Sequence, residues 1–331
     1  MRHKHGNLAV FVPHVGCPHL CSFCDQCVIS GAQRMPTPQD VTAFCASALA
    51  QNNDRDLELA FFGGSFTAID RDYMCRLLEA ASVFVGKGIC GIRLSTRPDA
   101  VGDEMLALLK TYPVTAIELG AQSMNDAVLL KNERGHTAQD VIDSAARVRR
   151  FGFELGLQMM VGLDGETAQD SYDTAQKLIA CSPNTVRIYP ALVLKGTALA
   201  KRVASGAYRP LTLEEGIQRT ARVMELFERA PSNIRIIRVG LHPSAELEQK
   251  LIAGPYHPAF RELCESRLLL SRLFKALENV ATGNIVIGVH PKDMSRMIGQ
   301  HRCNLAALAQ CGYIARVIPK ETATRLCPEL L

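Results

Sequence analysis

The stretch Cys17-Pro18-His19-Leu20-Cys21-Ser22-Phe23-Cys24 places three cysteines at the spacing C-x3-C-x2-C. It directly follows an apolar run, residues 8–15, which predicts a buried β-strand. Thiolates grouped on a short loop are ligands that suit iron–sulfur clusters and zinc. A closed structural zinc site normally takes four ligands, whereas a cubane cluster held by three thiolates keeps one iron open for another molecule. The spacing therefore favours an iron–sulfur cluster with an open position.

A fourth cysteine, Cys27, leaves two other interpretations open. Cys21, Cys24 and Cys27 begin a ferredoxin pattern, but residues 28–31 lack the further cysteine and proline that should complete it. A zinc site made of Cys17, Cys21, Cys24 and Cys27 would crowd four ligands into 11 residues. Zinc ligands usually come as two separated pairs, so both alternatives fit the sequence less well than a three-cysteine cluster.

With Phe23 just before the third cysteine, the motif resembles that of the radical S-adenosylmethionine (radical SAM) superfamily. The resemblance implies that Cys17, Cys21 and Cys24 hold a [4Fe-4S] cluster whose open iron chelates the amino and carboxylate groups of SAM. It also implies reductive cleavage of SAM to a 5′-deoxyadenosyl radical. A one-electron donor of the flavodoxin or ferredoxin type follows as an expected partner.

Length and composition set the broad class of the protein. The 331 residues allow about two domains, and 47% apolar residues are enough for a sizeable core. Eight of the twelve cysteines are scattered through apolar patterns, which indicates buried thiols in a reducing compartment and predicts a cytoplasmic protein. No stretch approaches about 18 uninterrupted apolar residues, so we expect neither a membrane span nor a membrane partner.

The first 240 residues alternate β-rich runs with helical patterns, which is typical of repeated βα units and a parallel sheet. We predict strands over residues 8–15, 57–62, 91–95, 114–119, 154–161 and 185–194. We predict helices between them over residues 39–51, 71–85, 102–110, 138–151 and 168–180. Six such units predict an α/β fold, a partial (βα)6 TIM-like barrel. Chemistry gathers at the carboxyl ends of strands in such barrels, and the cysteine loop follows the first strand.

Glycines at the end of the second predicted strand offer a second piece of the site. The sequence there reads Phe61-Phe62-Gly63-Gly64-Ser65-Phe66-Thr67. Paired glycines let the backbone approach a ligand because no Cβ stands in the way, although a lone pair is more often an ordinary turn. The segment Gly63-Gly64-Ser65, which follows the cysteine motif and ends a strand, resembles the superfamily's glycine motif that binds the SAM amino group. The resemblance implies that Gly63, Gly64 and Ser65 bind SAM.

Later motifs narrow the resemblance to one branch. The sequences Thr96-Arg97-Pro98-Asp99, Glu118-Leu119-Gly120-Ala121-Gln122-Ser123 and Arg134-Gly135-His136-Thr137 follow in this order. They resemble the branch that contains the Elongator catalytic subunit, a tRNA wobble-uridine enzyme, with oxygen-independent coproporphyrinogen oxidase as a more distant relative. By motif, Gln122 and Arg134 contact SAM, and Gln158 faces its ribose. In Thr96–Asp99, a helix start with Asp99 near the cap is the alternative reading.

The segment 163–166 and Tyr189 are the last features of this region that bear on the site. Relatives have Leu-Pro-Gly-Glu where this chain reads Leu163-Asp164-Gly165-Glu166, and the turn stays plausible without the proline. Tyr189, at the end of the sixth predicted strand, is the candidate to face the substrate at the barrel mouth; a packed core tyrosine is the alternative. The resemblance covers residues 8–260, so we expect a radical SAM core (residues 1–260) without the acetyltransferase domain of Elongator-type proteins.

Residues 261–331 form a second predicted domain. They hold 10 Lys and Arg against 6 Asp and Glu, so the whole net charge of +4 lies there. Basic charge concentrated in one domain weakly favours a nucleic acid as a binding partner. The order strand, helix, loop, helix, strand over residues 283–318 resembles a small KH module, whose GxxG loop clamps a nucleic-acid backbone. Here the loop reads Gly299-Gln300-His301-Arg302, so Arg302 replaces the second glycine and is a candidate phosphate contact; a structural α/β cap is the alternative.

The leading hypothesis from the sequence is a radical SAM enzyme that modifies RNA, with a tRNA-like substrate recruited by the tail. A radical SAM reaction on a small molecule, as in the porphyrinogen branch, is the second hypothesis. A non-catalytic, RNA-binding iron–sulfur sensor is the third. RNA crosslinking to the loop 299–302 separates the first hypothesis from the second, and reductive SAM cleavage separates both enzymes from the sensor.

Overall fold

The structure, a computed structural model, describes residues 6–13, 16–17, 20–31, 34–51 and 57–331. Within these residues seven parallel strands form one curved sheet in the order β1-β2-β3-β4-β5-β6-β8. Its strands are β1 (Gly6–Val12), β2 (Leu57–Gly63), β3 (Ile89–Thr96), β4 (Val114–Gln122), β5 (Glu154–Val161), β6 (Thr185–Pro190) and β8 (Arg235–Val239). Each strand pairs in parallel with its neighbour in this order, so all carboxyl ends meet at one edge. The predicted α/β fold with a partial TIM-like barrel is confirmed.

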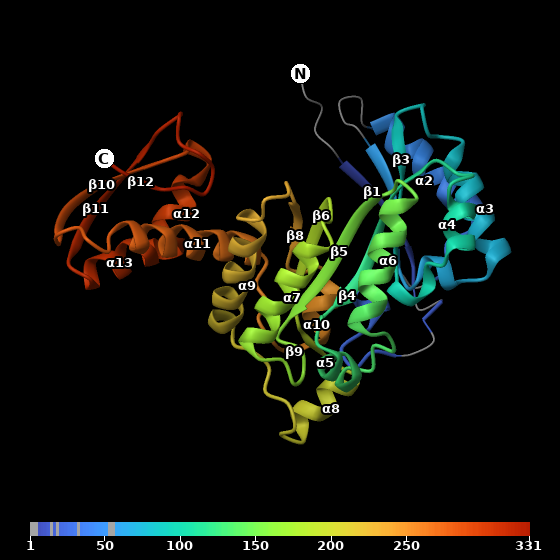
Figure 1. The fold of residues 1–331 in the computed structure, drawn as a ribbon, viewed down its shortest axis with the longest axis horizontal. Helices are drawn as coiled ribbons and strands as arrows, with labels where there is room; N and C mark the ends of the chain where they lie inside the picture. Colours follow the sequence, from blue (N-terminus) through green and yellow to red (C-terminus); the bar gives the residue numbers. More distant parts are fainter. Residues whose placement is uncertain (1–5, 14–15, 18–19, 32–33, 52–56) are drawn as a thin grey trace.

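Helices connect the strands and cover the sheet (Figure 1). The longer ones are α2 (Pro38–Gln51), α3 (Arg71–Ser82), α4 (Asp103–Leu109), α6 (Ala138–Arg150), α7 (Ala168–Ala180) and α9 (Leu213–Glu228). Three of them begin with a reciprocal capping box, formed by Thr137 with Asp140, Thr167 with Asp170 and Thr212 with Glu215. These caps satisfy backbone N–H groups that a helix start otherwise leaves unpaired, so the sequence fixes where α6, α7 and α9 begin. None of the helices in the described part of the chain is long and apolar enough to cross a bilayer.

Two predictions about the strands are wrong in detail. The sixth strand was expected to run to residue 194 but ends at Pro190, because proline has no N–H to continue a ladder. Val193–Leu194 instead form β7, which pairs antiparallel with β9 (Leu251–Ala253). Beyond the six predicted strands, Arg235–Val239 form β8, which adds a seventh parallel strand beside β6. The first strand ends at Val12, and the last residues of its predicted range, 14–15, lie outside the described residues.

Four short helices that were not predicted support the loops at the carboxyl edge. They are α1 (Gln26–Ser30), α5 (Asp126–Lys131), α8 (Ala198–Ala204) and α10 (Ala245–Lys250). Asn125 caps α5 by accepting hydrogen bonds from the N–H groups of Ala127 and Val128. None of the four is longer than seven residues, so none shows the extended 3.6-residue periodicity that identifies a helix in sequence.

Buried charges lie between the strands near their amino ends. Arg93 of β3 contacts the carboxylates of Glu58 at 2.8 Å, Glu118 at 3.3 Å and Glu154 at 3.4 Å. Arg187 of β6 forms two hydrogen bonds to Glu118, at 2.7 and 3.0 Å, and its guanidinium lies 4.8 Å from the centre of the Phe62 ring. We call Glu58, Arg93, Glu118, Glu154 and Arg187 the barrel-floor network. It links β2, β3, β4, β5 and β6 beneath the carboxyl edge.

The tail begins with the long helix α11 (Phe260–Ala276), which packs on α9 at one side and on α12 at the other. After it come β10 (Gly283–Val289), α12 (Met294–Ile298), α13 (Cys303–Gln310), β11 (Tyr313–Pro319) and β12 (Glu329–Leu330). β10 pairs parallel with β11 and antiparallel with β12. Figure 1 shows this unit, in orange and red, at the end of α11 away from the sheet. The predicted order strand, helix, loop, helix, strand is present, and the proposed boundary at residue 260 stays a prediction.

Candidate cofactor site at the cysteine loop

The cysteine loop lies at the carboxyl edge of the sheet, after β1 and before α1. Ser22, between two of the cysteines, anchors it. Its N–H donates to the Asn132 carbonyl at 3.2 Å, and its hydroxyl donates to the Asn132 side-chain oxygen at 2.9 Å. The carbonyl of Ser22 accepts a 2.7 Å hydrogen bond from the N–H of Leu199, at the start of α8. Two loops distant in sequence therefore hold the cysteines in place.

The three cysteine side chains share one environment. Burial, followed by the neighbouring thiols of Cys21 and Cys17, raises the pKa of the Cys24 thiol from 9.0 to about 12. Such an influence requires the three sulfur atoms to lie near one another. Cys17 Sγ also lies 3.9 Å from the Ser65 hydroxyl and accepts a 3.6 Å hydrogen bond from Gln26. Metal ligation requires thiolates, and the positive iron centres of a cluster would supply the charge that stabilises them here.

Arg134 connects the cysteines to the end of β4. Its Nη1 donates to Cys21 Sγ at 3.3 Å, and its Nη2 donates to the Gly120 carbonyl at 2.6 Å. Its Nε is buried and has no hydrogen-bond partner among the described residues. A Cβ at Gly120 would lie 3.2 Å from Arg134 Nη2, so the glycine makes room for this guanidinium. A buried donor left unpaired beside the cysteines fits an anionic ligand that the protein binds there.

The two predicted glutamines meet next to Arg134. Gln158 of β5 donates a 3.2 Å hydrogen bond to the side-chain oxygen of Gln122. Gln122 ends β4 with φ at +64°, in the left-handed region, where a residue other than glycine is strained. The register between β4 and β5 shifts at the same point, between Gly120 and Gln122. This irregularity turns the Gln122 side chain toward Gln158 and over Gly120.

The glycine motif lies across from these residues, at the end of β2. Gly63 has φ at +120°, and a Cβ there would lie 2.5 Å from the Val12 carbonyl oxygen. The N–H of Gly64 donates to the same carbonyl at 2.9 Å. The ends of β1 and β2 are thus held in contact, which places the buried Ser65 beside Cys17. The structure therefore brings Cys17, Cys21, Ser65, Gly120 and Arg134 into one region.

Arg97, to which the sequence assigned no ligand, belongs to the same region. It is 3% exposed and forms two 2.9 Å hydrogen bonds to Asp99 through Nε and Nη2. Its Nη1 is buried without a partner among the described residues. Burial lowers the pKa of Arg97, but the hydrogen bonds and charge of Asp99 and, less strongly, the neighbouring Cys21 and Cys17 raise it overall, so the guanidinium lies close to the cysteines. The signal in the sequence was an arginine at the carboxyl end of a strand, read there as part of a helix start.

His136 is the second residue that sequence reasoning passed over. Its Nε2 lies 3.2 Å from the Ala121 carbonyl oxygen and therefore carries the proton, which leaves Nδ1 as an acceptor. Nδ1 is buried without a partner in the described part of the chain. Burial, followed by the charge of Arg134, lowers the pKa of His136 from 6.5 to about 4, so the ring is neutral at pH 7. Arg97, Arg134 and His136 thus each offer one unused polar atom in the same region.

Tyr189 lies on the barrel side of this site. It is half-buried and packs in a small apolar cluster with Phe23 of the cysteine loop, Met160 and Ala191. Its hydroxyl is hydrogen-bonded to Arg187 of the barrel-floor network. The tyrosine therefore has one contact with the cysteine loop and one with the charges beneath. This position between the two is consistent with a residue at the barrel mouth.

The side chain of Cys27 lies outside the described residues, so the four-cysteine zinc site stays a prediction from sequence alone. Among the residues that the structure describes, no three Cys, His, Asp or Glu side chains are arranged around a single metal ion. The three thiols together with the unpaired Arg134 Nε and Arg97 Nη1 fit a [4Fe-4S] cluster with a bound SAM. Cys17, Cys21 and Cys24 would hold the cluster, and the two arginines would face the anionic groups.

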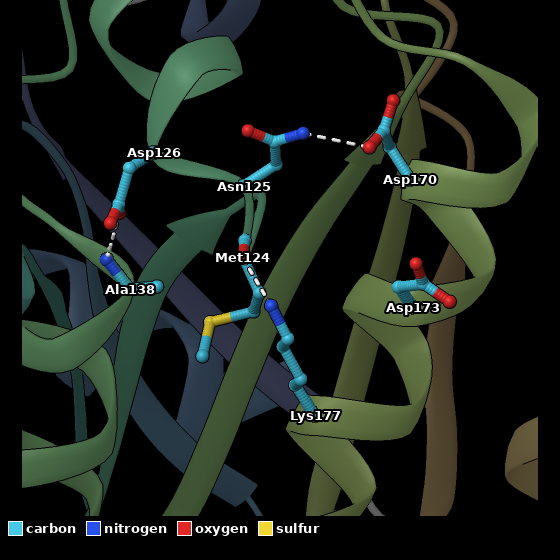
Figure 2. Close-up of a pocket in the computed structure, with 7 residues that line it drawn as sticks. All are labelled: Met124, Asn125, Asp126, Ala138, Asp170, Asp173 and Lys177. Atoms are coloured by element: carbon cyan, nitrogen blue, oxygen red, sulfur yellow. Dashed lines mark hydrogen bonds between the residues drawn. The ribbon is translucent and has the colours of Figure 1, made fainter.

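A separate pocket of about 260 Å³ lies where α5, α6 and α7 begin (Figure 2). Its polar groups bind one another: Asn125 donates to Asp170 at 2.7 Å, and Lys177 donates to the Met124 carbonyl at 3.0 Å. Asp126 accepts a 2.7 Å hydrogen bond from the N–H of Ala138. None of the predicted SAM-binding residues lines this pocket. Its contacts join helix starts and leave the cysteine region as the candidate site.

The predicted tail loop keeps an unusual backbone. Gly299 has φ at +80°, and His301 and Arg302 follow with φ at +52° and +62°. Arg302 thus adopts the left-handed conformation that the second glycine of a GxxG loop enters without strain. His301 and Arg302 are exposed, and the buried Asn304 fixes the loop by hydrogen bonds to the carbonyls of Arg296 and Met297, both at 3.1 Å. The order of elements is the predicted one, while the KH-like resemblance and its nucleic-acid role stay predictions.

Comparisons with known proteins identify two regions. The family model of the radical SAM superfamily matches residues 11–178, just over half of the chain. That of the radical SAM C-terminal domain matches residues 183–269. Elongator complex protein 3 of Bos taurus is 29% identical over 64% of this chain and 42% of its own length. The tRNA uridine(34) acetyltransferase of Dehalococcoides mccartyi is 24% identical over 82% of this chain and 66% of its own length. The chain thus spans less than half of the bovine relative.

Solved structures share the fold. Elp3 of the archaeon Methanocaldococcus infernus superposes with a TM-score of 0.62 at 20% identity, over 83% of this chain and 63% of that one. The coproporphyrinogen III oxidase HemN of Escherichia coli gives a TM-score of 0.51 at 14% identity, over 69% of this chain and 53% of that one. Identities this low compare folds alone.

Proposed function

The chain belongs to the radical SAM superfamily, and we propose that it is an RNA-modifying enzyme whose substrate is a tRNA. Members of this superfamily bind a [4Fe-4S] cluster and SAM. When bound, the cluster supplies one electron to SAM and so starts radical chemistry on a substrate. The residues of this chain bind and orient these groups, shield them from water and present the substrate.

The observation that carries the proposal is the position of Arg134. It touches Cys21 and the Gly120 carbonyl with two of its nitrogens and keeps its buried Nε unpaired. A guanidinium forks to a carboxylate through two parallel hydrogen bonds, so Arg134 would hold the carboxylate of SAM beside the cysteines. Gln122 and Gln158, which hydrogen-bond to each other, would contact the nucleoside of SAM, with Gly63, Gly64 and Ser65 at its amino group.

Three features support RNA as the substrate. Two relatives named above are a subunit of Elongator and a tRNA uridine acetyltransferase, and the second is similar over most of this chain. The tail carries the net positive charge of the protein. Its loop holds exposed His301 and Arg302 in a backbone suited to a close approach by phosphates, with Gly299 and Gln300 before them. Tyr189 would then face the target base at the barrel mouth.

The proposal also names partners and a compartment. A flavodoxin or a ferredoxin would donate the electron, because the chemistry begins with a one-electron reduction. A cytoplasmic location would follow from a substrate that is tRNA and from the cysteines scattered through apolar patterns of the sequence, which suit a reducing compartment.

The test is SAM cleavage by the anaerobically reconstituted protein, with and without bulk tRNA. We expect tRNA to increase the formation of 5′-deoxyadenosine, and tRNA digested with ribonuclease to give no increase. Hydrolysed tRNA controls for nucleotides and contaminating metals. SAM cleavage that is indifferent to tRNA but rises with a porphyrinogen would contradict the RNA proposal and support the small-molecule alternative.

A further inference from the structure

A cleft of about 310 Å³ lies between the last strand of the barrel and the tail. One wall comes from β8 and the loop after it, with Arg238 and His242. The other wall comes from the start of α11 and from α12, with Arg261 and Arg296. Figure 1 shows α11 running from beside β8 and α9 to the tail, so the cleft lies where the two parts of the chain join.

The cleft is built from side chains that are tied together. Glu265 of α11 contacts Arg261 Nε at 2.8 Å and Arg296 Nε at 2.6 Å. Arg261 Nη1 donates to the Ile236 carbonyl at 3.2 Å and thereby joins α11 to β8. Because these contacts fix both walls relative to each other, the arginines do not have to be ordered when a ligand enters.

Arg238 is the cation that this arrangement leaves available. Its Nε donates to the Gly240 carbonyl at 3.0 Å, and its two terminal nitrogens have no partner among the described residues. It is half-buried, and it pairs in register with Arg187, two residues before Tyr189 on the neighbouring strand. The three arginines and His242 face Glu262 and Glu265, so positive charge is in excess. The first turn of α11, without a side-chain cap, adds N–H groups on the same side.

The cleft also lies between the two sites already described. Arg296 is on the five-residue helix α12, and Gly299 ends that helix and begins the tail loop. On the other side, Arg238 belongs to the strand next to Tyr189. Arg238, Arg261 and Arg296 line this one cleft. Because Glu265 already pairs with Arg261 and Arg296, and Asp293 pairs with Arg296, Arg238 is the guanidinium left to bind a phosphate of a nucleic-acid strand.

We propose that this cleft binds the sugar–phosphate backbone of the RNA between the tail loop and the barrel mouth, with Arg238 as a phosphate contact. The inference rests on the proposed function and adds to it the route by which the substrate enters. The contact carries no base specificity, because it reads only phosphate. Arg238 is a binding residue for the RNA and takes no part in holding the cluster or SAM.

The experiment measures binding of fluorescently labelled bulk tRNA to the anaerobically reconstituted full-length protein, at salt concentrations from about 50 to 200 mM. Wild type is compared with Arg238→Ala, Arg238→Lys and the control Arg76→Ala. Arg76 is exposed on α3, on the other side of the sheet in Figure 1, and its replacement removes the same charge. Cluster absorbance and SAM cleavage without RNA are measured for every variant, to establish that each one is folded and loaded.

We expect Arg238→Ala to bind tRNA about tenfold more weakly, the effect of losing one charge-assisted hydrogen bond. Its logarithmic salt slope should fall by about 0.7–0.9, the value for one phosphate. Arg238→Lys should retain most of that slope, and Arg76→Ala should match wild type. Equal tRNA binding by wild type, Arg238→Ala and Arg76→Ala would overturn the proposal that the cleft binds the RNA backbone, and would not affect the proposed function. If the wild type with its cluster bound does not bind tRNA, both the proposed role of the cleft and the proposed RNA substrate are wrong.

Discussion

Replacing Arg93 by methionine tests the barrel-floor network, on which the shape of the site depends. Arg93 and its partners Glu58 and Glu118 are each less than 5% exposed. Arg93 contacts Glu58 at 2.8 Å and Glu118 at 3.3 Å, so its removal leaves buried carboxylates without their main positive neighbour. Methionine keeps a side chain of similar length and fills most of the space, so the lost charge dominates the effect.

Breaking a buried ion pair by removing one partner costs about 3–5 kcal/mol. Arg187 still pairs with Glu118, and the Thr115 hydroxyl still donates to Glu58 at 2.9 Å, so the lower end of that range applies. For a protein of 331 residues, about 3 kcal/mol corresponds to a fall of roughly 4 °C in the thermal midpoint. The measurement is far-UV circular dichroism during heating at pH 7, under reducing conditions.

The double variant Arg93→Met/Glu58→Gln is the matched control. Removing the carboxylate that was left unpaired should recover part of the loss, so that the two changes are not additive. The reasoning is refuted if Arg93→Met lowers the midpoint by less than about 2 °C, since the network would then contribute little. It is also refuted if the second substitution lowers the midpoint further.

Three further predictions follow from single residues. Arg134→Lys cannot form the two parallel hydrogen bonds of a guanidinium to a carboxylate, so it should weaken SAM binding to the reconstituted protein by about tenfold in equilibrium dialysis. Unchanged binding would contradict the proposed role of Arg134. Burial raises the pKa of Glu166 from 4.5 to about 7, so folding favours its protonated form and wild type loses stability as pH rises from 4.5 to 7. The free energy of unfolding of Glu166→Gln minus that of wild type should therefore be about 3 kcal/mol larger at pH 8 than at pH 4, as measured from denaturation curves. An equal difference at both pH values would disprove the pKa shift. Arg302→Gly should keep the thermal midpoint within about 2 °C, because φ is +62° there, yet weaken tRNA binding; unchanged tRNA affinity would remove Arg302 from the phosphate contacts.

The arrangement of the barrel was predictable because its strands are apolar on both faces and alternate with helices that carry their own caps. The errors came from strand ends. Residues 189–194 are apolar throughout, and Pro190 was the signal that the strand stops there. The seventh strand was visible as an apolar run, but its parallel partner, β6, is fixed only by packing.

Of the candidate site, too, only part could be predicted from the sequence. Gln122 and Ser65, at or just after strand ends, and Arg134, in the loop between α5 and α6, were found because each belongs to a recognisable motif. Arg97 and His136 lay inside two of the same motifs, but only their burial and unpaired nitrogens in the folded protein indicate a ligand. Arg93, Glu118 and Arg187 are charges within apolar strands, and their mutual contacts join segments more than 20 residues apart.

The central claim is that three cysteines hold a cluster that cleaves SAM. The most direct test reconstitutes wild type and Cys21→Ala anaerobically with iron and sulfide, records the cluster absorbance, and then adds dithionite and SAM. We predict a loaded cluster and 5′-deoxyadenosine from wild type, and neither from the variant, because Cys21 is a proposed cluster ligand and accepts a hydrogen bond from Arg134. A wild-type protein that takes up zinc and no iron–sulfur cluster, or a Cys21→Ala variant that cleaves SAM as wild type does, would contradict the account.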